Sequence, residues 1–256
     1  MILTLVQIQV FVLILSRVAG IFLEAPVYSA RSFSTSAKIA MVIWITITMW
    51  FNAPVKSLPP DISSFILLLI NEFIIGFAIG FICNAFFESL QSAGNLIDLQ
   101  MGTSIASAMD PNTGAMSSMI GRLTYFMGIV LFLILNGHHM VLSAVNQSFR
   151  VLPIGYQINF FNPNLVLQMI GIVSSMLLIS LQLSVPALLM IFLSDFSFGI
   201  VSRVAPQVNV FMLGFQVKPS LGILALLFSI PLLTSQVGTL INNMMAEIVK
   251  LFVYLK

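Results

Sequence analysis

The sequence has very few charged residues. Asp, Glu, Lys and Arg make up 7% of its 256 residues, whereas hydrophobic residues make up 59%. A typical soluble domain has about 25% charged and about 45–50% apolar residues. So few charges cannot cover a surface that faces water, and the composition therefore predicts an integral membrane protein. The net charge of +2 is also too small to favour nucleic acid as a partner.

Side chains that carry out metal or nucleophilic chemistry are also scarce. Cys83 is the only cysteine, which excludes a disulfide or a cysteine-rich metal site within one chain. The two histidines, His138 and His139, are adjacent, and neighbours on a helix do not point toward one metal ion. The chain has no G-x-S-x-G motif, no phosphate-binding loop and no dinucleotide-binding fingerprint. The sequence therefore predicts a protein that binds no cofactor and is not an enzyme.

Apolar stretches separated by short polar breaks recur along the chain and predict an all-α, multi-helix membrane protein. No polar stretch is long enough for a separate soluble domain, so residues 1–256 are expected to form a single membrane subunit. We expect six to seven helices, several of them broken, over these blocks: Ile2–Phe22, Ile39–Phe51, Ile62–Phe87, Leu123–Leu135, Met140–Phe149, Leu165–Leu193, Leu221–Leu233 and Val237–Leu255. Pro186 should kink the longest block, because proline cannot donate a hydrogen bond within a helix.

The segment Glu88–Thr124 contains no Phe, Trp or Tyr, although aromatic residues make up 11% of the chain. It consists mainly of Ser, Ala, Gly, Thr and Met, and it lies between long apolar stretches. Lipid cannot satisfy the backbone polar groups of such a segment, so the segment must pack against protein or line a wet cavity. We therefore expect the functional part of the molecule to lie here.

Charged residues within the apolar stretches are predicted to hold helices or subunits together. Arg17 and Glu24 lie about two turns apart on the first helix, and we expect them to pair at the membrane boundary. Glu72 lies deep in an apolar stretch, so its carboxylate should face protein or water rather than lipid. Nearby, Gly76 and Gly80 form a small-residue face that permits close contact between helices.

Two further pairs of charges flank polar segments. Asp98 and Arg122 enclose most of the aromatic-free segment, and Asp195 and Arg203 flank the next polar stretch. Each of these charges can pair within the chain or with another subunit. A buried charge that loses its partner typically costs about 3–5 kcal/mol, so we expect none of them to lie alone in lipid.

Several motifs follow one another in a specific order along the chain. They read SRVAGIFLEAPVYS (Ser16–Ser29), LIDLQMGTSIASAMDP (Leu96–Pro111), LFLILNGHH (Leu131–His139), LPIG (Leu152–Gly155) and RVAPQVNVFMLGFQVKPSLG (Arg203–Gly222). In this order they resemble the FliR/SpaR family of type III secretion export-gate subunits. The resemblance covers most of the chain, and the RVAPQVNVF and NGHH motifs look closer to the flagellar branch than to the virulence branch.

The resemblance implies a subunit of the flagellar protein export gate in the bacterial inner membrane, within the flagellar basal body. Members of this family assemble with FliP and FliQ, contact FlhB and FlhA, and help unfolded flagellar export substrates to cross the membrane. The resemblance also implies long kinked helical hairpins. Residues from about 1 to 190 would resemble FliP, and residues from about 191 to 256 would form a FliQ-like hairpin.

In that family, the segment that matches Met101–Met119 is a loop that plugs the channel. The glycines of this plug segment permit a mobile loop, and its methionines suit an adaptable seal. We expect Ile105 and Met109 to close the channel. The resemblance places these residues in the plug: Met101, Gly102, Ile105, Met109, Asp110, Pro111, Gly114, Met116 and Met119. Contacts with helices or subunits are expected from Glu72, Asp98, Arg122, Asp195, Arg203 and Gln207.

Three alternatives stay open at this point. The chain can be the equivalent gate subunit of a virulence secretion system. It can be a stand-alone solute transporter, which would need an internal repeat and a binding site within one chain. It can also be an intramembrane enzyme with two carboxylates sharing one site, for which Asp98, Asp110 and Asp195 are the candidates.

Overall fold

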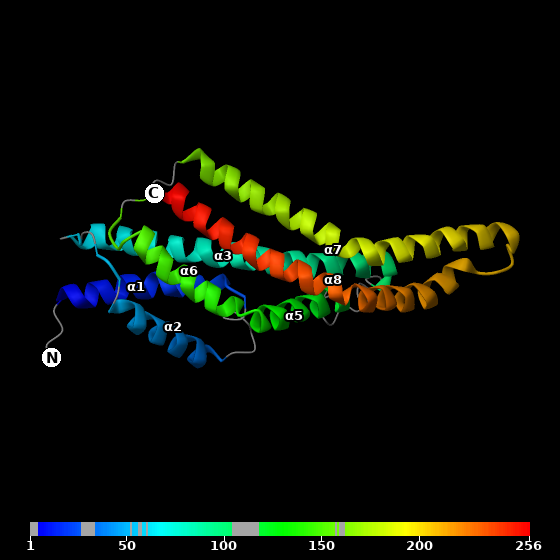
Figure 1. The fold of residues 1–256 in the computed structure, drawn as a ribbon, viewed down its shortest axis with the longest axis horizontal. Helices are drawn as coiled ribbons and strands as arrows, with labels where there is room; N and C mark the ends of the chain where they lie inside the picture. The colour runs from blue at the N-terminus through cyan, green and yellow to red at the C-terminus, as the bar shows by residue number, and fades with distance from the viewer. Residues whose placement is uncertain are drawn as a thin grey trace. The chain divides into compact units, whose positions relative to one another are not determined.

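The protein is built from helices in the computed structural model, which describes residues 5–26, 34–51, 53–55, 58–59, 61–103, 118–156, 158 and 162–256. The helices are α1 (Leu5–Glu24), α2 (Thr35–Trp50), α3 (Ile62–Met101), α5 (Met119–Ile134), α6 (Gly137–Val151), α7 (Pro163–Val204) and α8 (Val210–Leu255) (Figure 1). This architecture confirms the predicted all-α class.

Four of these helices are long and apolar enough to cross a membrane, namely α1, α3, α7 and α8. Helices α5 and α6 can form a fifth span as a pair, with a bend of 71° at the break between them. The break falls in the NGHH motif, where Asn136 has the left-handed backbone conformation with φ of 57°. A residue in this conformation cannot continue a right-handed helix, so Asn136 ends the regular path of the chain.

Three helices extend beyond their predicted ends, and the predicted breaks after Phe87, Leu193 and Leu233 are wrong. Helix α3 continues to Met101, α7 continues to Val204, and α8 runs without interruption through Pro219 and Pro231. Serine hydroxyls within the long helices donate to carbonyls three or four residues earlier, as Ser197 does to Leu193 at 2.8 Å. Because these hydroxyls find acceptors within the helix, the polar stretches remain helical.

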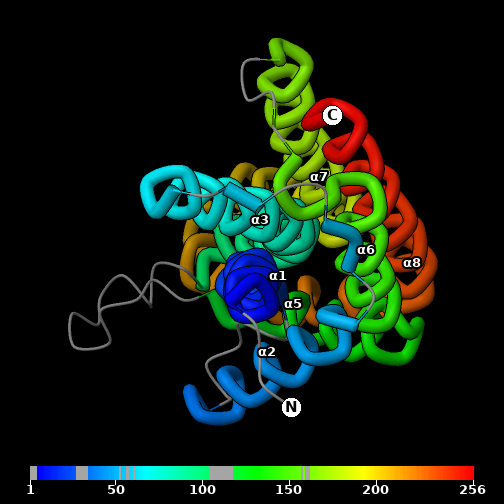
Figure 2. The backbone as a smooth tube through the Cα atoms, turned by 90° about the vertical axis from the view of Figure 1, so that its left-hand side faces the viewer, coloured from blue at the N-terminus to red at the C-terminus, as the bar shows by residue number. Residues whose placement is uncertain are grey.

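The chain divides into two compact units. The first unit contains Met1–Phe86, Leu133–Val173 and Ile241–Lys256. Within it, α1 and α3 pack with their backbones close together, as the neighbouring tubes in Figure 2 show. A Cβ atom added at Gly20 would lie 2.5 Å from the Phe73 carbonyl oxygen, and one added at Gly80 would lie 2.8 Å from that of Ile21. The predicted role of Gly76 and Gly80 in close helix packing is therefore confirmed.

The second unit contains Phe87–Phe132 and Ser174–Leu240. Its α3 and α5 segments cross closely, because a Cβ atom added at Gly94 would lie 2.5 Å from the Cα atom of Gly121. Helix α7 contains Pro186 within its continuous span (Figure 1). The core joins α3, α5, α7 and α8 through these buried side chains: Ile97, Met101, Ile120, Ala187, Ile191, Ala225 and Leu226.

Candidate functional site

Asp98 lies near the end of α3, and its buried carboxylate accepts hydrogen bonds from both sides of a chain segment. Only 3% of the residue is exposed. Its Oδ1 atom accepts from the Thr103 hydroxyl at 2.7 Å, while Oδ2 accepts from the Ser118 hydroxyl and from the Ile120 backbone N–H at 3.1 Å. We call Asp98, Thr103, Ser118 and Ile120 the Asp98 network. One carboxylate therefore joins the two residues that flank positions 104–117.

The Asp98 network also forms the start of α5. Ser118 precedes the first residue of this helix, and its hydroxyl oxygen accepts from the Gly121 N–H at 2.7 Å. The first N–H groups of a helix have no partner within the helix, and they favour a nearby negative charge. The Asp98 carboxylate supplies both a hydrogen-bond acceptor for the Ile120 N–H and a negative charge near the start of α5. Thr124 adds a second tie, because its hydroxyl donates to the Leu90 carbonyl of α3 at 2.9 Å.

The plug residues predicted from the resemblance fall in different surroundings. Met101 is buried, and a Cβ atom added at Gly222 of α8 would lie 2.6 Å from its sulfur. Gly102 has a positive φ of 80°, a conformation that favours glycine, and lies beside Phe215. Met119 begins α5 and is 80% exposed. The others, Ile105, Met109, Asp110, Pro111, Gly114 and Met116, lie outside the described residues.

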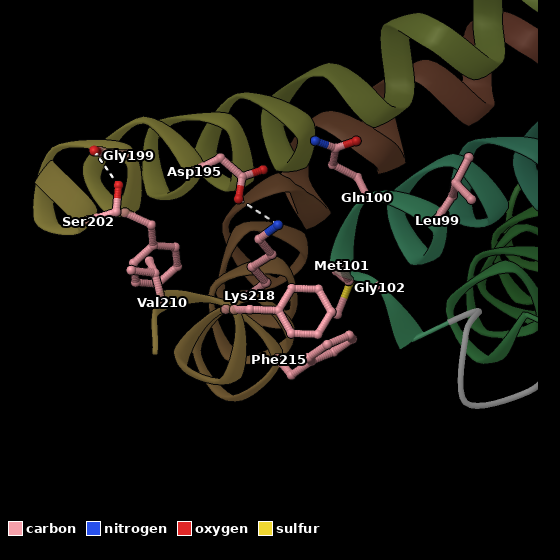
Figure 3. A pocket seen from close by; sticks show the side chains of 13 residues that line it. Leu99, Gln100, Met101, Gly102, Asp195, Gly199, Ser202, Val210, Phe215 and Lys218 are labelled. Carbon is pink, nitrogen blue, oxygen red and sulfur yellow. Dashed lines mark hydrogen bonds and ion pairs between the residues drawn. The ribbon is translucent and has the colours of Figure 1, made fainter. Parts of the chain in front are cut away.

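A pocket of about 560 Å³ lies next to Met101 and Gly102, between the ends of α7 and α8 in the second unit. Figure 3 shows the Lys218 side chain reaching across it toward Asp195. The Lys218 Nζ atom lies 2.5 Å from Asp195 Oδ1, and the two side chains are 24% and 35% exposed. Asp195 thus pairs within the chain, with a lysine that the sequence analysis did not single out.

Three other residues with predicted contacts, Arg122, Arg203 and Gln207, lie at the surface of the second unit. Arg203 is exposed in the last turn of α7, and Gln207 is exposed in the turn before α8. Arg122 is exposed in the first turn of α5. The Asp98 carboxylate accepts its hydrogen bonds from Thr103, Ser118 and Ile120. Asp98 and Asp195 have separate sets of partners, and Asp110 lies outside the described residues. Asp98 and Asp195 therefore do not form the carboxylate pair that an intramembrane aspartyl enzyme needs.

Arg17 and Glu72 form a buried ion pair in the first unit, which confirms that Glu72 faces protein. Arg17 Nε lies 2.6 Å from Glu72 Oε2, and the two side chains are 0% and 2% exposed. The guanidinium also donates to the Ser148 hydroxyl at 3.2 Å and to the Leu152 carbonyl at 2.9 Å. We call these four residues the Arg17 network. The Cζ atom of the Arg17 guanidinium also lies over the Phe149 ring, 4.2 Å from its centre.

The predicted pairing of Arg17 with Glu24 is wrong. Glu24 instead accepts a hydrogen bond from the Asn84 side chain at 3.2 Å. Arg17 faces α3 and α6 in the interior, where desolvation favours a partner that is itself enclosed. Sequence spacing on α1 showed which charges share a face of that helix, but it could not show which residue of another helix lies opposite.

Among the described residues, no three His, Cys, Asp or Glu side chains gather where they could hold a metal ion. The sequence analysis missed Thr103, Ser118 and Lys218. A serine directly before a helix is a common N-cap signal, so Ser118 could have been found. Thr103 and Lys218 carry no such signal, because their partners are set by the fold.

Comparison with known proteins shows which protein family this chain resembles. Residues 8–244 match the model of "Bacterial export proteins, family 1". The chain is 30% identical to the flagellar biosynthetic protein FliR of Bacillus subtilis over 221 residues, which cover 85% of this chain and 84% of the relative. It is 29% identical to the FliR protein of Escherichia coli over 238 residues, covering 92% and 90%. It is also 25% identical to the surface presentation of antigens protein SpaR of Shigella flexneri, covering 85% of each chain.

Proposed function

Because this chain belongs to the family 1 bacterial export proteins, we propose that it is a subunit of the flagellar protein export gate. In this role it forms part of the channel through which unfolded flagellar proteins cross the inner membrane. The plug segment, Met101–Met119, helps to close that channel. The family is one of export components, and this membership confirms that the protein is not an enzyme.

The observation that carries the plug proposal is the Asp98 network. Its hydrogen bonds fix both flanks of positions 104–117, since Thr103 and Ser118 bind the same carboxylate. The sequence between them is SIASAMDPNTGAMS, which has small residues, one proline and two methionines but no aromatic side chain. Firmly held flanks around a small-residue segment suit a loop that must seal a channel and then yield to passing chains.

The surfaces of α7 and α8 support assembly with other subunits. Large apolar side chains are exposed along both helices, including Phe192, Phe211 and Phe228. Such extended apolar surface must be covered by lipid or by protein. We propose FliP and FliQ as the partners that cover part of it, with FlhB and FlhA contacting the assembled gate in the flagellar basal body. We also propose that residues 1–190 correspond to a FliP-like part and that residues 191–256 contribute a FliQ-like hairpin.

Purification of the tagged full chain from native membranes tests this function. A gate subunit should co-purify with FliP and FliQ, and deletion of its gene should abolish export of flagellar proteins. The stand-alone transporter predicts a stable monomer or homo-oligomer, and that result with normal flagellar export would overturn the proposal. The match to SpaR favours a virulence secretion gate as the second candidate. Loss of virulence-type secretion with normal flagella would identify that candidate.

A further inference from the structure

The pocket between the ends of α7 and α8 combines an ion pair with exposed apolar side chains. Asp195 of α7 and Lys218 of α8 meet in it at 2.5 Å (Figure 3), and both side chains remain partly exposed. Leu99, Phe211 and Phe215 also line the pocket, and all three are exposed. Its volume of about 560 Å³ falls within the range of small-molecule sites, about 300–1,000 Å³. The pocket therefore has the size and the mixed lining of a site for an amphipathic ligand.

The ion pair determines which ligand charges suit this pocket. A purely anionic ligand that approaches Lys218 also meets the carboxylate of Asp195, and a purely cationic ligand meets the lysine ammonium. A ligand that carries one anion and one cation satisfies both side chains, because its anion accepts from Lys218 while its cation donates to Asp195. Hydrogen bonds between charged groups are stronger than those between neutral groups. The pair therefore favours a zwitterion.

The surroundings of the pocket favour a membrane lipid as the source of that zwitterion. Helices α7 and α8 are apolar enough to cross a membrane. They have 42 and 46 residues, whereas the hydrocarbon core needs only about 20, so their charged ends can reach the lipid headgroups. Basic pockets between membrane helices bind such headgroups.

We propose that this pocket binds a zwitterionic phospholipid such as phosphatidylethanolamine. The lipid phosphate accepts from Lys218, the headgroup ammonium donates to Asp195, and an acyl chain lies along the exposed rings of Phe211 and Phe215. This inference goes beyond the export function and does not depend on it.

The pocket can be altered without disturbing the fold. A partly exposed ion pair contributes little to stability, so Asp195→Asn and Lys218→Gln should both fold. Gly199 also lines the pocket, and nothing lies within 4 Å of a Cβ atom added there. Gly199→Leu therefore fills free space beside the ion pair and blocks the pocket without removing a charge.

The test measures lipid affinity by native mass spectrometry of the full chain, purified with its partners and stripped of lipid. The probes are phosphatidylethanolamine, which is zwitterionic, and phosphatidylglycerol, which is anionic and carries the same acyl chains. The wild type should bind phosphatidylethanolamine more tightly. Asp195→Asn should weaken that binding on the order of tenfold, as expected for one lost hydrogen bond between charged groups. It should also bind phosphatidylglycerol more tightly than the wild type does, because Lys218 loses its competing carboxylate.

Two further variants and a matched control complete the test. Lys218→Gln and Gly199→Leu should weaken the binding of both lipids. Lys250→Gln is the control, because it breaks another ion pair of α8, with Glu247 at 2.7 Å, that lies in the first unit. Its lipid affinities should equal those of the wild type.

Three results would overturn the proposal. The first is equal affinity of the wild type for the two lipids, or unchanged lipid binding in Lys218→Gln and Gly199→Leu. The second is displacement of the lipid by an equal concentration of free phosphoethanolamine, which would identify a soluble ligand instead. The third is loss of a co-purifying protein from Gly199→Leu with unchanged lipid binding, which would show that a protein fills the pocket. If Asp195→Asn does not fold, Lys218→Gln and Gly199→Leu decide by the same criteria.

Discussion

Glu72 and Asp98 are both buried carboxylates, but the protein balances their charges in different ways. Glu72 faces a guanidinium, so a full positive charge lies 2.6 Å from its Oε2 atom. Among the described residues, the Asp98 carboxylate accepts hydrogen bonds from two hydroxyls and one backbone N–H. The first arrangement ties α1, α3 and α6 inside one unit. The second joins the ends of α3 and α5 across a segment of small residues.

The Arg17 network is therefore a permanent structural contact, whereas the Asp98 network can lose one of its hydrogen bonds. Loss of either partner in the Arg17 network leaves a full charge enclosed in protein, which is very unfavourable. Each donor of the Asp98 network is a neutral group, and one of them can leave while the others still bind the carboxylate. The comparison thus predicts that changes at Arg17 abolish folding, whereas the loss of one Asp98 hydrogen bond leaves a protein that still folds.

The largest expected effect is that of Arg17→Met. This substitution leaves the Glu72 carboxylate buried without its cation, which typically costs about 3–5 kcal/mol. We expect the amount of folded protein in the membrane to fall sharply, as measured by resistance to protease and by thermal unfolding in detergent. Arg150→Met removes an exposed arginine in the last turn of α6 and serves as the control. The double variant Arg17→Met/Glu72→Met should recover part of the loss; equal stability of Arg17→Met and wild type would contradict the account.

Gly76→Ala should have the next largest effect. The added methyl group would collide with the backbone carbonyl of Arg17, so α1 and α3 must move apart. Overpacking of this kind typically costs about 1–3 kcal/mol. Gly199→Ala on α7 is the matched control, because nothing lies within 4 Å of its added Cβ atom. Thermal unfolding of both variants checks the prediction. Equal destabilisation of the two would show that helix propensity, not close packing, determines the change in stability.

The sequence alone was sufficient for the fold class, for the buried position of Glu72 and for the close packing at Gly76 and Gly80. These features follow from composition and from periodicity within one helix. The ends of α3, α7 and α8 were harder to predict, because serine and proline remain compatible with a helix whose polar groups find acceptors within it or whose bends suit the packing. The partners of Arg17, Asp98 and Asp195 are set by other helices, and no pattern within one segment reveals them.

The aromatic-free segment, Glu88–Thr124, extends well beyond the proposed plug segment. Part of its small-residue composition serves the close crossing of α3 and α5, where Gly94 and Gly121 leave no room for a side chain. Met101 likewise packs within the helical core. The proposed closure therefore concentrates on positions 104–117, between Thr103 and Ser118.

Arg203→Glu should have the smallest effect on the chain itself. Arg203 is exposed at the end of α7, and exposed substitutions usually change stability by less than about 0.5 kcal/mol. If Arg203 contacts another subunit, as we predict, charge reversal should still reduce co-purification with FliP and FliQ. Lys218→Gln, which breaks only the ion pair with Asp195 inside the chain, is the control and should leave co-purification unchanged. Intact complexes from Arg203→Glu would count against a subunit contact at this arginine.

Ion flux through the assembled complex that lacks residues 105–114 tests the central claim most directly. The complex is purified with its partners, reconstituted into vesicles, and compared with the wild-type complex at equal protein content in the absence of export substrate. A plug held between Thr103 and Ser118 predicts vesicles that are tight with the wild type and leaky with the deletion. Equal, low flux through both complexes would show that this segment does not close the channel.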